Sequence, residues 1–172
     1  MTHMNPRDDG FAKQFVVRGA TAPDAAAIAS LLWEAFREFE ALYTREAFAA
    51  TVLSEAGVLA RMREGPLWVA ETGSSIICSV GGTVGAIQVG DVVTIRGMAA
   101  LPSVRGLGVG RNLLDHVERF AAHERAGLLE LYTTAFLDGA IRLYQAAGFA
   151  FTGETINPSG TELLRMTKAV NR

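Results

Sequence analysis

Three glycines alternate at positions 106, 108 and 110, and Arg105 stands directly before them. An apolar, strand-like run ends shortly before this turn, and an amphipathic helical pattern begins where the turn ends. Alternating glycines let the backbone approach an anion and direct its N–H groups toward it, and the helix adds the positive end of its dipole. Arginine is a planar, permanently charged donor that suits phosphate oxygens. The turn therefore predicts a phosphate-binding site between a strand and a helix, unless the glycines form only a flexible turn.

Two familiar phosphate-binding patterns do not fit this turn. A dinucleotide motif, G-x-G-x-x-G, that began at Gly106 would need glycine where Arg111 stands, and one that began at Gly108 would need it at Leu113. The P-loop pattern G-x-x-x-x-G-K-[ST] does not occur in the sequence either. Ordinary dinucleotide and P-loop binding are therefore disfavoured.

The composition is typical of one globular domain with a substantial core, since 49% of the 172 residues are hydrophobic and 20% are charged. A net charge of −2 does not favour binding to nucleic acid or to a membrane surface. No stretch approaches the roughly 18 apolar residues of a membrane span, and the single Cys78 indicates a reducing compartment. We expect a cytoplasmic protein with a flexible tail over residues 1–12 and one domain over residues 13–172.

The hydrophobic pattern predicts the element order β-α-α-β-β-β-α-β-α-β-β. Strands are expected at residues 15–18, 67–71, 76–80 or 76–83, 91–100, 128–133, 149–152 and 163–167. Helices are expected after Thr21, over residues 45–64 with an interruption at Gly57, over 110–126 and over 138–147. The pair Gly81-Gly82 is expected to separate or bend the strands on either side of it.

The glycine turn lies inside a predicted β-α-β crossover. Its two strands, residues 91–100 and 128–133, should therefore be parallel, whereas the short turns between the earlier strands favour antiparallel pairs. The predicted fold class is a mixed α/β fold, with a mostly antiparallel sheet of six to seven strands and helices on both faces.

Two segments carry a resemblance to a known family. Residues 100–110, ALPSVRGLGVG, match the core motif of the GCN5-related N-acetyltransferase (GNAT) family, apolar-x-Pro-x-x-[Arg/Gln]-Gly-x-Gly-apolar-[Gly/Ala], at every position. Residues 140–149, AIRLYQAAGF, are similar to the family's Ala-x-x-x-Tyr-x-x-x-Gly-Phe segment. The resemblance implies the acyl-CoA N-acyltransferase fold and direct transfer of the acetyl group of acetyl-CoA to a primary amine of a small molecule or peptide.

The resemblance also assigns the cofactor site. It implies that backbone N–H groups of residues 105–110 hold the pyrophosphate, and that the pantetheine arm pairs with the backbone of residues 98–100 where the two parallel strands separate. Backbone donors in that gap could also stabilise the oxyanion of the tetrahedral intermediate. The implied cofactor-binding residues are Met98, Ala99, Ala100, Arg105, Gly106, Leu107, Gly108, Val109, Gly110, Arg111, Leu137 and Tyr144.

Tyr144 is the candidate catalytic acid, because a phenol is protonated at neutral pH and can give its proton to the departing sulfur. Spacing alone favours a tyrosine packed in the core, and the second motif places it near the sulfur instead. Leu137 stands where the family frequently has asparagine, so one contact to the cofactor arm is expected to be missing.

The general base has no assignment in the sequence. Thr94 occupies the position at which family members often carry glutamate, and threonine cannot take a proton from an ammonium group. A water chain or an amine that arrives neutral would serve instead. The nearest candidate carboxylates, each also compatible with a solvated surface position, are Asp91, Glu34, Glu38 and Glu40.

Three residues are candidates for the acceptor site: Thr94, Arg96 and Phe36. Arg96 lies in a strand expected to be buried. It either pairs with a carboxylate or extends to an edge of the sheet, or it faces the cleft and recognises a substrate carboxylate. Phe36 either lines the cleft or packs in the core. The scattered histidines and single cysteine make no metal site.

Two rivals remain beside the acetyltransferase: a non-catalytic acyl-CoA-binding regulatory module, and a nucleotide-binding module of another fold. The resemblance leaves a homodimer open, because family members often form dimers.

Overall fold

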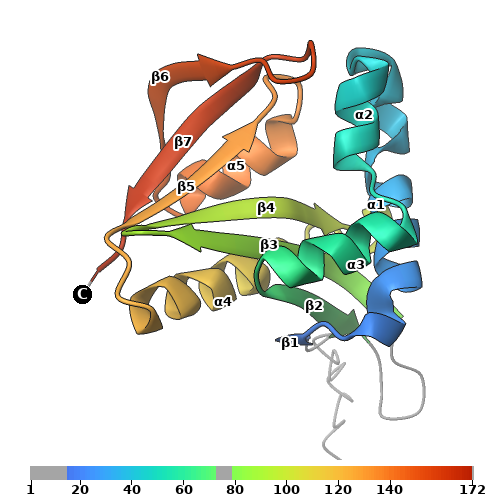
Figure 1. The fold of residues 1–172 in the computed structure, drawn as a ribbon, viewed down its shortest axis with the longest axis horizontal. Helices are drawn as coiled ribbons and strands as arrows, with labels where there is room; N and C mark the ends of the chain where they lie inside the picture. The colour runs from blue at the N-terminus through green and yellow to red at the C-terminus, as the bar shows by residue number, and fades with distance from the viewer. Residues whose placement is uncertain (1–14, 73–78, 172) are drawn as a thin grey trace, which may run out of the picture.

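The computed structural model describes residues 15–72 and 79–171 (Figure 1). In this part of the chain, seven strands form one sheet in the order β1-β2-β3-β4-β5-β7-β6. The strands are β1 (Val16–Gly19), β2 (Leu67–Thr72), β3 (Ser79–Val89), β4 (Val92–Ala100), β5 (Leu128–Thr133), β6 (Ala150–Ile156) and β7 (Leu163–Ala169). The α-helices are α1 (Ala25–Phe36), α2 (Arg45–Thr51), α3 (Glu55–Glu64), α4 (Val109–His123) and α5 (Asp138–Ala146), with short 3-10 helices at Ala22–Asp24, Arg37–Leu42 and Pro102–Val104.

The sheet has the predicted mixed pairing. β4 and β5 are parallel, and the other neighbouring strands are antiparallel. This pairing confirms the fold class and the crossover through the glycine turn. The expected tail over residues 1–12 and Cys78 lie outside the described residues, and the assignment of residues 13–172 to one domain stays a prediction.

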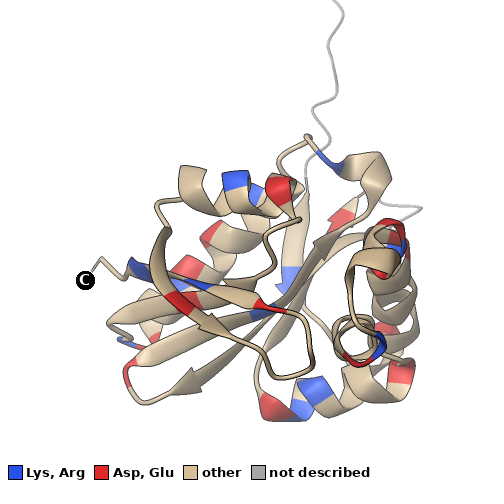
Figure 2. Ribbon diagram, turned by 90° about the horizontal axis from the view of Figure 1, so that it is seen from above, with Lys and Arg blue, Asp and Glu red and all other residues tan. Residues whose placement is uncertain are grey.

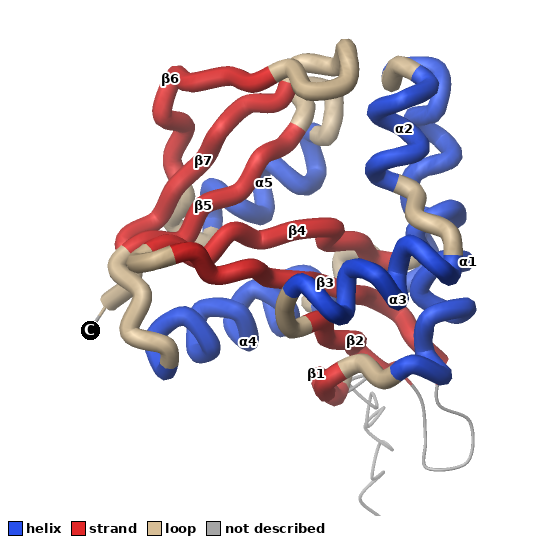
Figure 3. Tube along the Cα trace, in the orientation of Figure 1, coloured by secondary structure: helices blue, strands red, loops and turns tan. Residues whose placement is uncertain are grey.

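Two apolar clusters bury the two faces of the sheet. On one face, Leu113, Leu114 and Val117 of α4 pack under the central strands together with residues of α5. On the other face, α1 and α3 pack together over β2 and β4, with Ile28 and Val58 almost fully buried. Figure 3 shows these helices around the sheet, and Figure 2 shows acidic and basic residues interspersed along the chain. None of the helices that the structure describes combines the length and apolar composition that a bilayer crossing requires.

Gly81 and Gly82 lie inside β3, so they do not separate two strands as one form of the prediction had it. The pairing with β2 passes over Gly81, since Ala70 faces Gly82 and Glu71 faces Val80, so the predicted irregularity at this pair is present as a register shift. A Cβ atom on Gly82 would stand 3.0 Å from Leu113 Cδ1 and 3.0 Å from Val109 Cγ2. Glycine at this position therefore lets α4 pack closely against the sheet, and a strand as long as Ser79–Val89 runs through it.

The predicted interruption at Gly57 was also misplaced. The break lies between Thr51 at the end of α2 and Glu55 at the start of α3, and Gly57 belongs to the first turn of α3. Ser54 caps α3, because its Oγ accepts a hydrogen bond of 3.2 Å from the N–H of Gly57. A serine cap therefore decided where the helix begins.

β4 and β5 pair over only three residues each and then diverge (Figure 1). The register joins Val92–Thr94 with Leu128–Glu130. Beyond this point β4 contains a bulge, since Arg96 and Ala99 face Gly85 and Thr83, and Gly97 adopts a φ of +58°. β5 continues its pairing with β7 instead. The strands thus form the predicted opening in the sheet.

Arg18 of β1 joins three segments on the α1 side of the sheet. Its guanidinium donates two hydrogen bonds, of 2.8 and 2.9 Å, to Asp24 and also bonds Glu71 of β2. Asp24 in turn accepts a hydrogen bond of 2.7 Å from the backbone N–H of Thr21, completing a capping box. Arg18 and these bonds hold the pKa of Asp24 well below its usual range.

We expect Asp24→Asn to lower the free energy of unfolding by about 1 kcal/mol near neutral pH, because it removes this charged contact. The pKa of Asp24 is lower in the folded state, so the stabilisation is present above the unfolded pKa of about 4 and is lost as the pH falls toward the folded pKa. Urea denaturation at about pH 7 and about pH 2.5 should therefore show a smaller difference in acid.

The matched control is Glu34→Gln, which affects only an exposed pair with Arg37 at 3.1 Å. This variant should change the free energy of unfolding by less than about 0.5 kcal/mol. An Asp24→Asn effect that is the same at both pH values would contradict the assigned role of the ion pair.

Candidate active site

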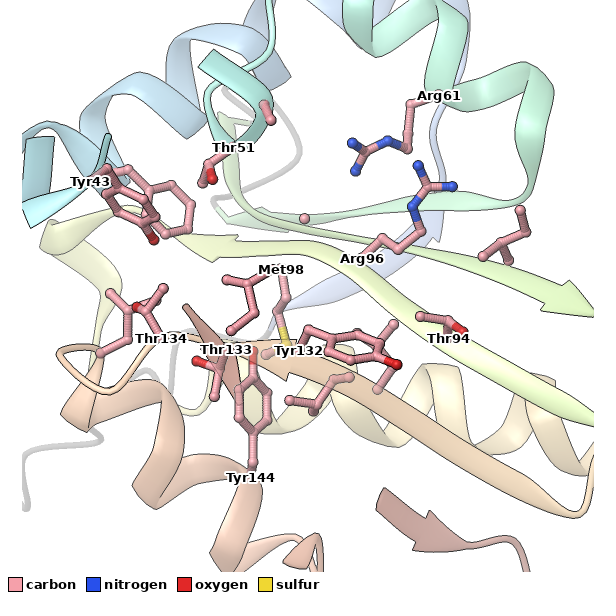
Figure 4. A pocket seen from close by; sticks show the side chains of 18 residues that line it. Tyr43, Thr51, Arg61, Thr94, Arg96, Met98, Tyr132, Thr133, Thr134 and Tyr144 are labelled. Atoms are coloured by element: carbon pink, nitrogen blue, oxygen red, sulfur yellow. The ribbon is translucent and has the colours of Figure 1, made fainter. Parts of the chain in front are cut away.

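A cavity of about 430 Å³ occupies the opening between β4 and β5 (Figure 4). Its floor comes from β4 and the end of β5, and one wall comes from α5. Side chains of α1, α2 and α3 form the opposite wall. The cavity therefore unites segments from both halves of the sequence, and it forms only where the two parallel strands separate.

The glycine turn lies between the end of β4 and the first residue of α4. Gly106 and Gly108 adopt φ values of +76° and +87°, which favour glycine. A Cβ on either residue would meet no atom within 4 Å, so backbone conformation and not crowding calls for glycine here. The N–H groups of Gly106, Gly108, Val109, Gly110 and Arg111 have no backbone acceptor within the described residues. The turn is exposed and presents a group of backbone donors at a helix N-terminus, as an anion site requires.

The Arg105 side chain does not serve as the free phosphate donor that the sequence predicts. Its guanidinium donates a hydrogen bond of 2.8 Å to the carbonyl oxygen of Ala35 and forms an ion pair with Glu38. The guanidinium thus holds the turn against the end of α1 and is not a free phosphate donor. Any anion at this turn depends chiefly on main-chain N–H groups.

Close packing connects the turn with the cavity. A Cβ on Gly110 would stand 2.7 Å from Leu143 Cδ2 and 3.5 Å from Met98 Cε. Glycine at this position lets the first turn of α4 approach both α5 and β4. The turn therefore has a fixed position relative to the helix that carries Tyr144.

Tyr144 projects from α5 into the cavity toward Met98 (Figure 4). Its side chain is buried, with 8% of the residue exposed, and its ring makes an edge contact with Phe149 at 6.1 Å. Burial raises the pKa of Tyr144 to about 12. The phenol is therefore protonated at neutral pH and available as a proton donor inside the cavity.

The three predicted acceptor residues line the same cavity. Thr94 donates a hydrogen bond of 2.8 Å to Oε1 of Glu130, its register partner on β5. Arg96 forms an ion pair of 2.7 Å with Glu64 at the end of α3 and remains 27% exposed. Both interpretations of Arg96 thus describe its position, since it has a carboxylate partner and also faces the cavity. Phe36 lies in the cavity wall.

The predicted cofactor residues divide into two groups. Met98, Leu137 and Tyr144 line the cavity, whereas the other predicted residues lie at the end of β4, in the turn and in the first turn of α4. Leu137 precedes α5 and presents an apolar side chain where asparagine was expected from the family pattern.

The cavity contains no carboxylate among its lining residues. Glu34 pairs with Arg37, Glu38 pairs with Arg105, and neither they nor Glu40 reach the lining. Asp91 lies at the turn between β3 and β4, away from the lining. The candidate carboxylate bases are thus outside the cavity. Within the described residues, no group of three or more His, Cys, Asp or Glu is arranged to hold a metal ion.

Sequence reasoning missed five polar residues of the lining: Thr51, Arg61, Tyr132, Thr133 and Thr134. Tyr132 had a signal, because it alternates with the buried Leu131 along a strand parallel to β4. Arg61 had none, since its position follows from how α3 packs on the sheet. Tyr43 was a candidate for the cleft or the core, and it lines the cavity. Thr134 is 2% exposed, and its Oγ1 makes no hydrogen bond of ordinary geometry within the described residues.

Comparison with known proteins gives a consistent picture. The model of the Acetyltransferase (GNAT) family matches residues 25–149. Streptothricin acetyltransferase of Streptomyces lavendulae is 41% identical over 61 residues, which are 36% of this chain and 32% of that protein. N-acetyltransferase 8 of Rattus norvegicus is 35% identical over 94 residues, 51% of this chain and 40% of that protein. The matched stretches thus span less than half of either relative.

Solved structures share the fold at low sequence identity. PaiA N-acetyltransferase from Thermoplasma acidophilum, in complex with coenzyme A, has a TM-score of 0.73 at 13% identity, over 91% of this chain and 99% of that one. The ribosomal-protein-S18-alanine N-acetyltransferase from Escherichia coli has a TM-score of 0.70 at 16% identity, over 92% and 96%. The family match includes both the glycine turn and Tyr144. With its turn, its crossover and its sheet all in agreement with that match, the chain belongs to the GNAT family of acetyltransferases.

Proposed function

We propose that this protein transfers the acetyl group of acetyl-CoA directly to a primary amine. The observation that carries the proposal is the opening between β4 and β5, which joins a turn rich in free N–H donors to a cavity that contains a buried tyrosine. Coenzyme A carries a diphosphate and, beyond it, a narrow arm that ends in a thiol. A protein that binds it therefore needs an anion-binding turn that leads into a narrow cavity. A structural neighbour of the same fold holds coenzyme A.

The cofactor would bind along β4. Its diphosphate would accept hydrogen bonds from the N–H groups of Gly106, Gly108 and the first residues of α4. Beyond Thr94, β4 has no strand partner on its β5 side among the described residues. The pantetheine arm can therefore pair with the backbone of Met98 and Ala100 as an additional strand. Leu137 would contact the arm through apolar surface only.

The transfer requires that the amine be aligned with the thioester and that a proton donor stand near the leaving sulfur. The amine nitrogen attacks the thioester carbonyl carbon, a C–N bond forms, and the C–S bond breaks as the tetrahedral intermediate collapses. The departing thiolate takes the phenolic proton of Tyr144. Since no carboxylate lines the cavity, the amine enters neutral or first loses its ammonium proton to water. The attacking nitrogen then gives up one further proton to water as the neutral amide forms. The phenolate recovers its proton from solvent after the products leave.

The runner-up function is a non-catalytic acyl-CoA-binding module. It is favoured by Thr94, which stands where a glutamate base is common, and by the lack of a carboxylate in the lining. Such a module would bind acetyl-CoA through the same turn and would release no thiol.

Incubation with acetyl-CoA and a panel of amines, with detection of free thiol and of the acetylated product, tests the proposal. We expect thiol release that requires both an amine and the protein. Saturable binding of acetyl-CoA without turnover of any amine in the panel would favour the binding module. If ATP or NAD occupied the site and coenzyme A did not compete for it, both the acetyltransferase and the acyl-CoA-binding module would be contradicted. That result would favour a nucleotide-binding module.

A further inference from the structure

Arg61 is a cation in the wall of the cavity that has no hydrogen-bonded or ion-paired partner among the described residues. It lies on α3 and is partly buried. Its Nη1 would stand 3.1 Å from a Cβ on Gly97, so the guanidinium lies directly above the bulge of β4. Burial, together with the nearby charge of Arg96, lowers the pKa of Arg61, and the charge of Glu64 opposes this only in part. Arginine nevertheless stays charged in proteins, so this position carries an unpaired positive charge.

The surroundings do not neutralise that charge. Arg96 is the other cation of the lining, and its charge is balanced by Glu64 at 2.7 Å. No Asp or Glu lines the cavity among the described residues. The three groups Arg61, Arg96 and Glu64 therefore leave one net positive charge beside the cavity. A partly desolvated charge is costly unless an anion pairs with it.

We propose that the amine acceptor also carries a carboxylate, and that Arg61 binds this carboxylate. The inference rests on the proposed function and names its substrate class, a small amino acid. One net positive charge balances one carboxylate, whereas a phosphate group would bring nearly two negative charges. A planar guanidinium also matches a carboxylate through two parallel hydrogen bonds.

The arrangement of the cavity suits a small acceptor with its two groups at different ends. Figure 4 shows the guanidinium groups of Arg61 and Arg96 together on the α3 side of β4, with Tyr144 on the α5 side and Met98 between them. The carboxylate would lie at Arg61 while the amine points toward the thioester near Met98 and Tyr144. The cavity, of about 430 Å³, must hold the acetyl group beside the reacting end of the acceptor.

Matched pairs of acceptors test this proposal. Alanine, leucine, phenylalanine and glutamate are each compared with the corresponding α-carboxamide, and with the aminophosphonate analogue where one exists, at saturating acetyl-CoA. We expect the amino acid to exceed its carboxamide in kcat/KM by roughly 10- to 100-fold, the effect of a hydrogen-bonded charge pair. Equal use of acid and amide, or a preference for the phosphonate, would overturn the assignment.

Two variants identify the residue responsible. Arg61→Gln removes the charge and should bring the ratio of acid to amide to within about threefold of unity, while acetyl-CoA affinity stays within about threefold of wild type. Arg63→Gln is the matched control, because Arg63 is exposed on the same helix and lies outside the lining. It should leave the ratio unchanged. A ratio that Arg61→Gln does not alter would overturn the role of Arg61.

A binding measurement separates failure of this inference from failure of the proposed function. N-acetyl amino acids and N-acetyl amino acid amides are titrated calorimetrically into protein saturated with coenzyme A. Preferential binding of the acids, abolished by Arg61→Gln, supports the carboxylate site whether or not thiol is released. Thiol release from amines without any preference for a carboxylate contradicts the site and leaves the acetyltransferase proposal intact.

Discussion

Gly108→Val is expected to weaken acetyl-CoA binding by about 100-fold or more while the protein remains folded. Gly108 has a φ of +87° at the N-terminus of α4, a conformation that a β-branched residue adopts only under strain. To relieve that strain, the peptide groups on either side must rotate. The N–H groups of Gly108 and Val109 would then point away from the diphosphate, and its charge would lose several hydrogen bonds at once.

Gly153→Val is the matched control for this effect. Gly153 has a φ of +84° on β6, and a Cβ there also meets no atom within 4 Å. Both variants should lose a similar amount of stability in thermal denaturation, roughly 1–2 kcal/mol. Only Gly108→Val should lose affinity in a calorimetric titration with acetyl-CoA. Equal affinities of the two variants would contradict the assignment of the diphosphate to the turn.

Tyr144→Phe is expected to lower kcat by roughly 10²- to 10³-fold, because the thiolate would leave without a proton donor. The KM for acetyl-CoA should stay within about threefold of wild type, since the phenol acts on the leaving group and not on binding. The ring contact with Phe149 is retained, because phenylalanine keeps the ring. The melting temperature should therefore change little.

The pH profile gives a second readout for Tyr144. Burial raises its pKa to about 12, so the phenol should stay protonated through the ordinary range of assay pH. No loss of activity that can be ascribed to Tyr144 is expected below about pH 10. A Tyr144→Phe variant that kept more than about half of the wild-type kcat would show that another group, or solvent, protonates the sulfur.

The crossover was predictable because its signals are local and agree with one another. Residues 128–133 alternate between the two faces, and β5 has the predicted bounds. The glycine errors arose where packing competes with local preference. Gly82 resembles a bend in sequence, but α4 packs against it and needs the missing side chain. Nothing within β3 itself indicates that a helix will approach there.

The site was predictable to the extent that it lies on the crossover. Thr94, Arg96, Met98 and Tyr144 belong to β4 or to the second motif, and all of them line the cavity. The rest of the lining could not be predicted in this way. Arg61 belongs to α3, whose position over β4 depends on how α1 and α3 pack together. In the sequence, its charge alone did not distinguish it from its exposed neighbour Arg63.

Main-chain N–H groups of the turn are expected to bind the diphosphate of coenzyme A. Calorimetric titration of the wild-type protein with acetyl-CoA and, separately, with S-acetylpantetheine tests this expectation most directly, because the second compound carries the same thioester arm without the diphosphate. We expect saturable binding of acetyl-CoA and at least about 100-fold weaker binding of S-acetylpantetheine. Equal affinities for the two compounds, or no binding of acetyl-CoA to the folded protein, would contradict it.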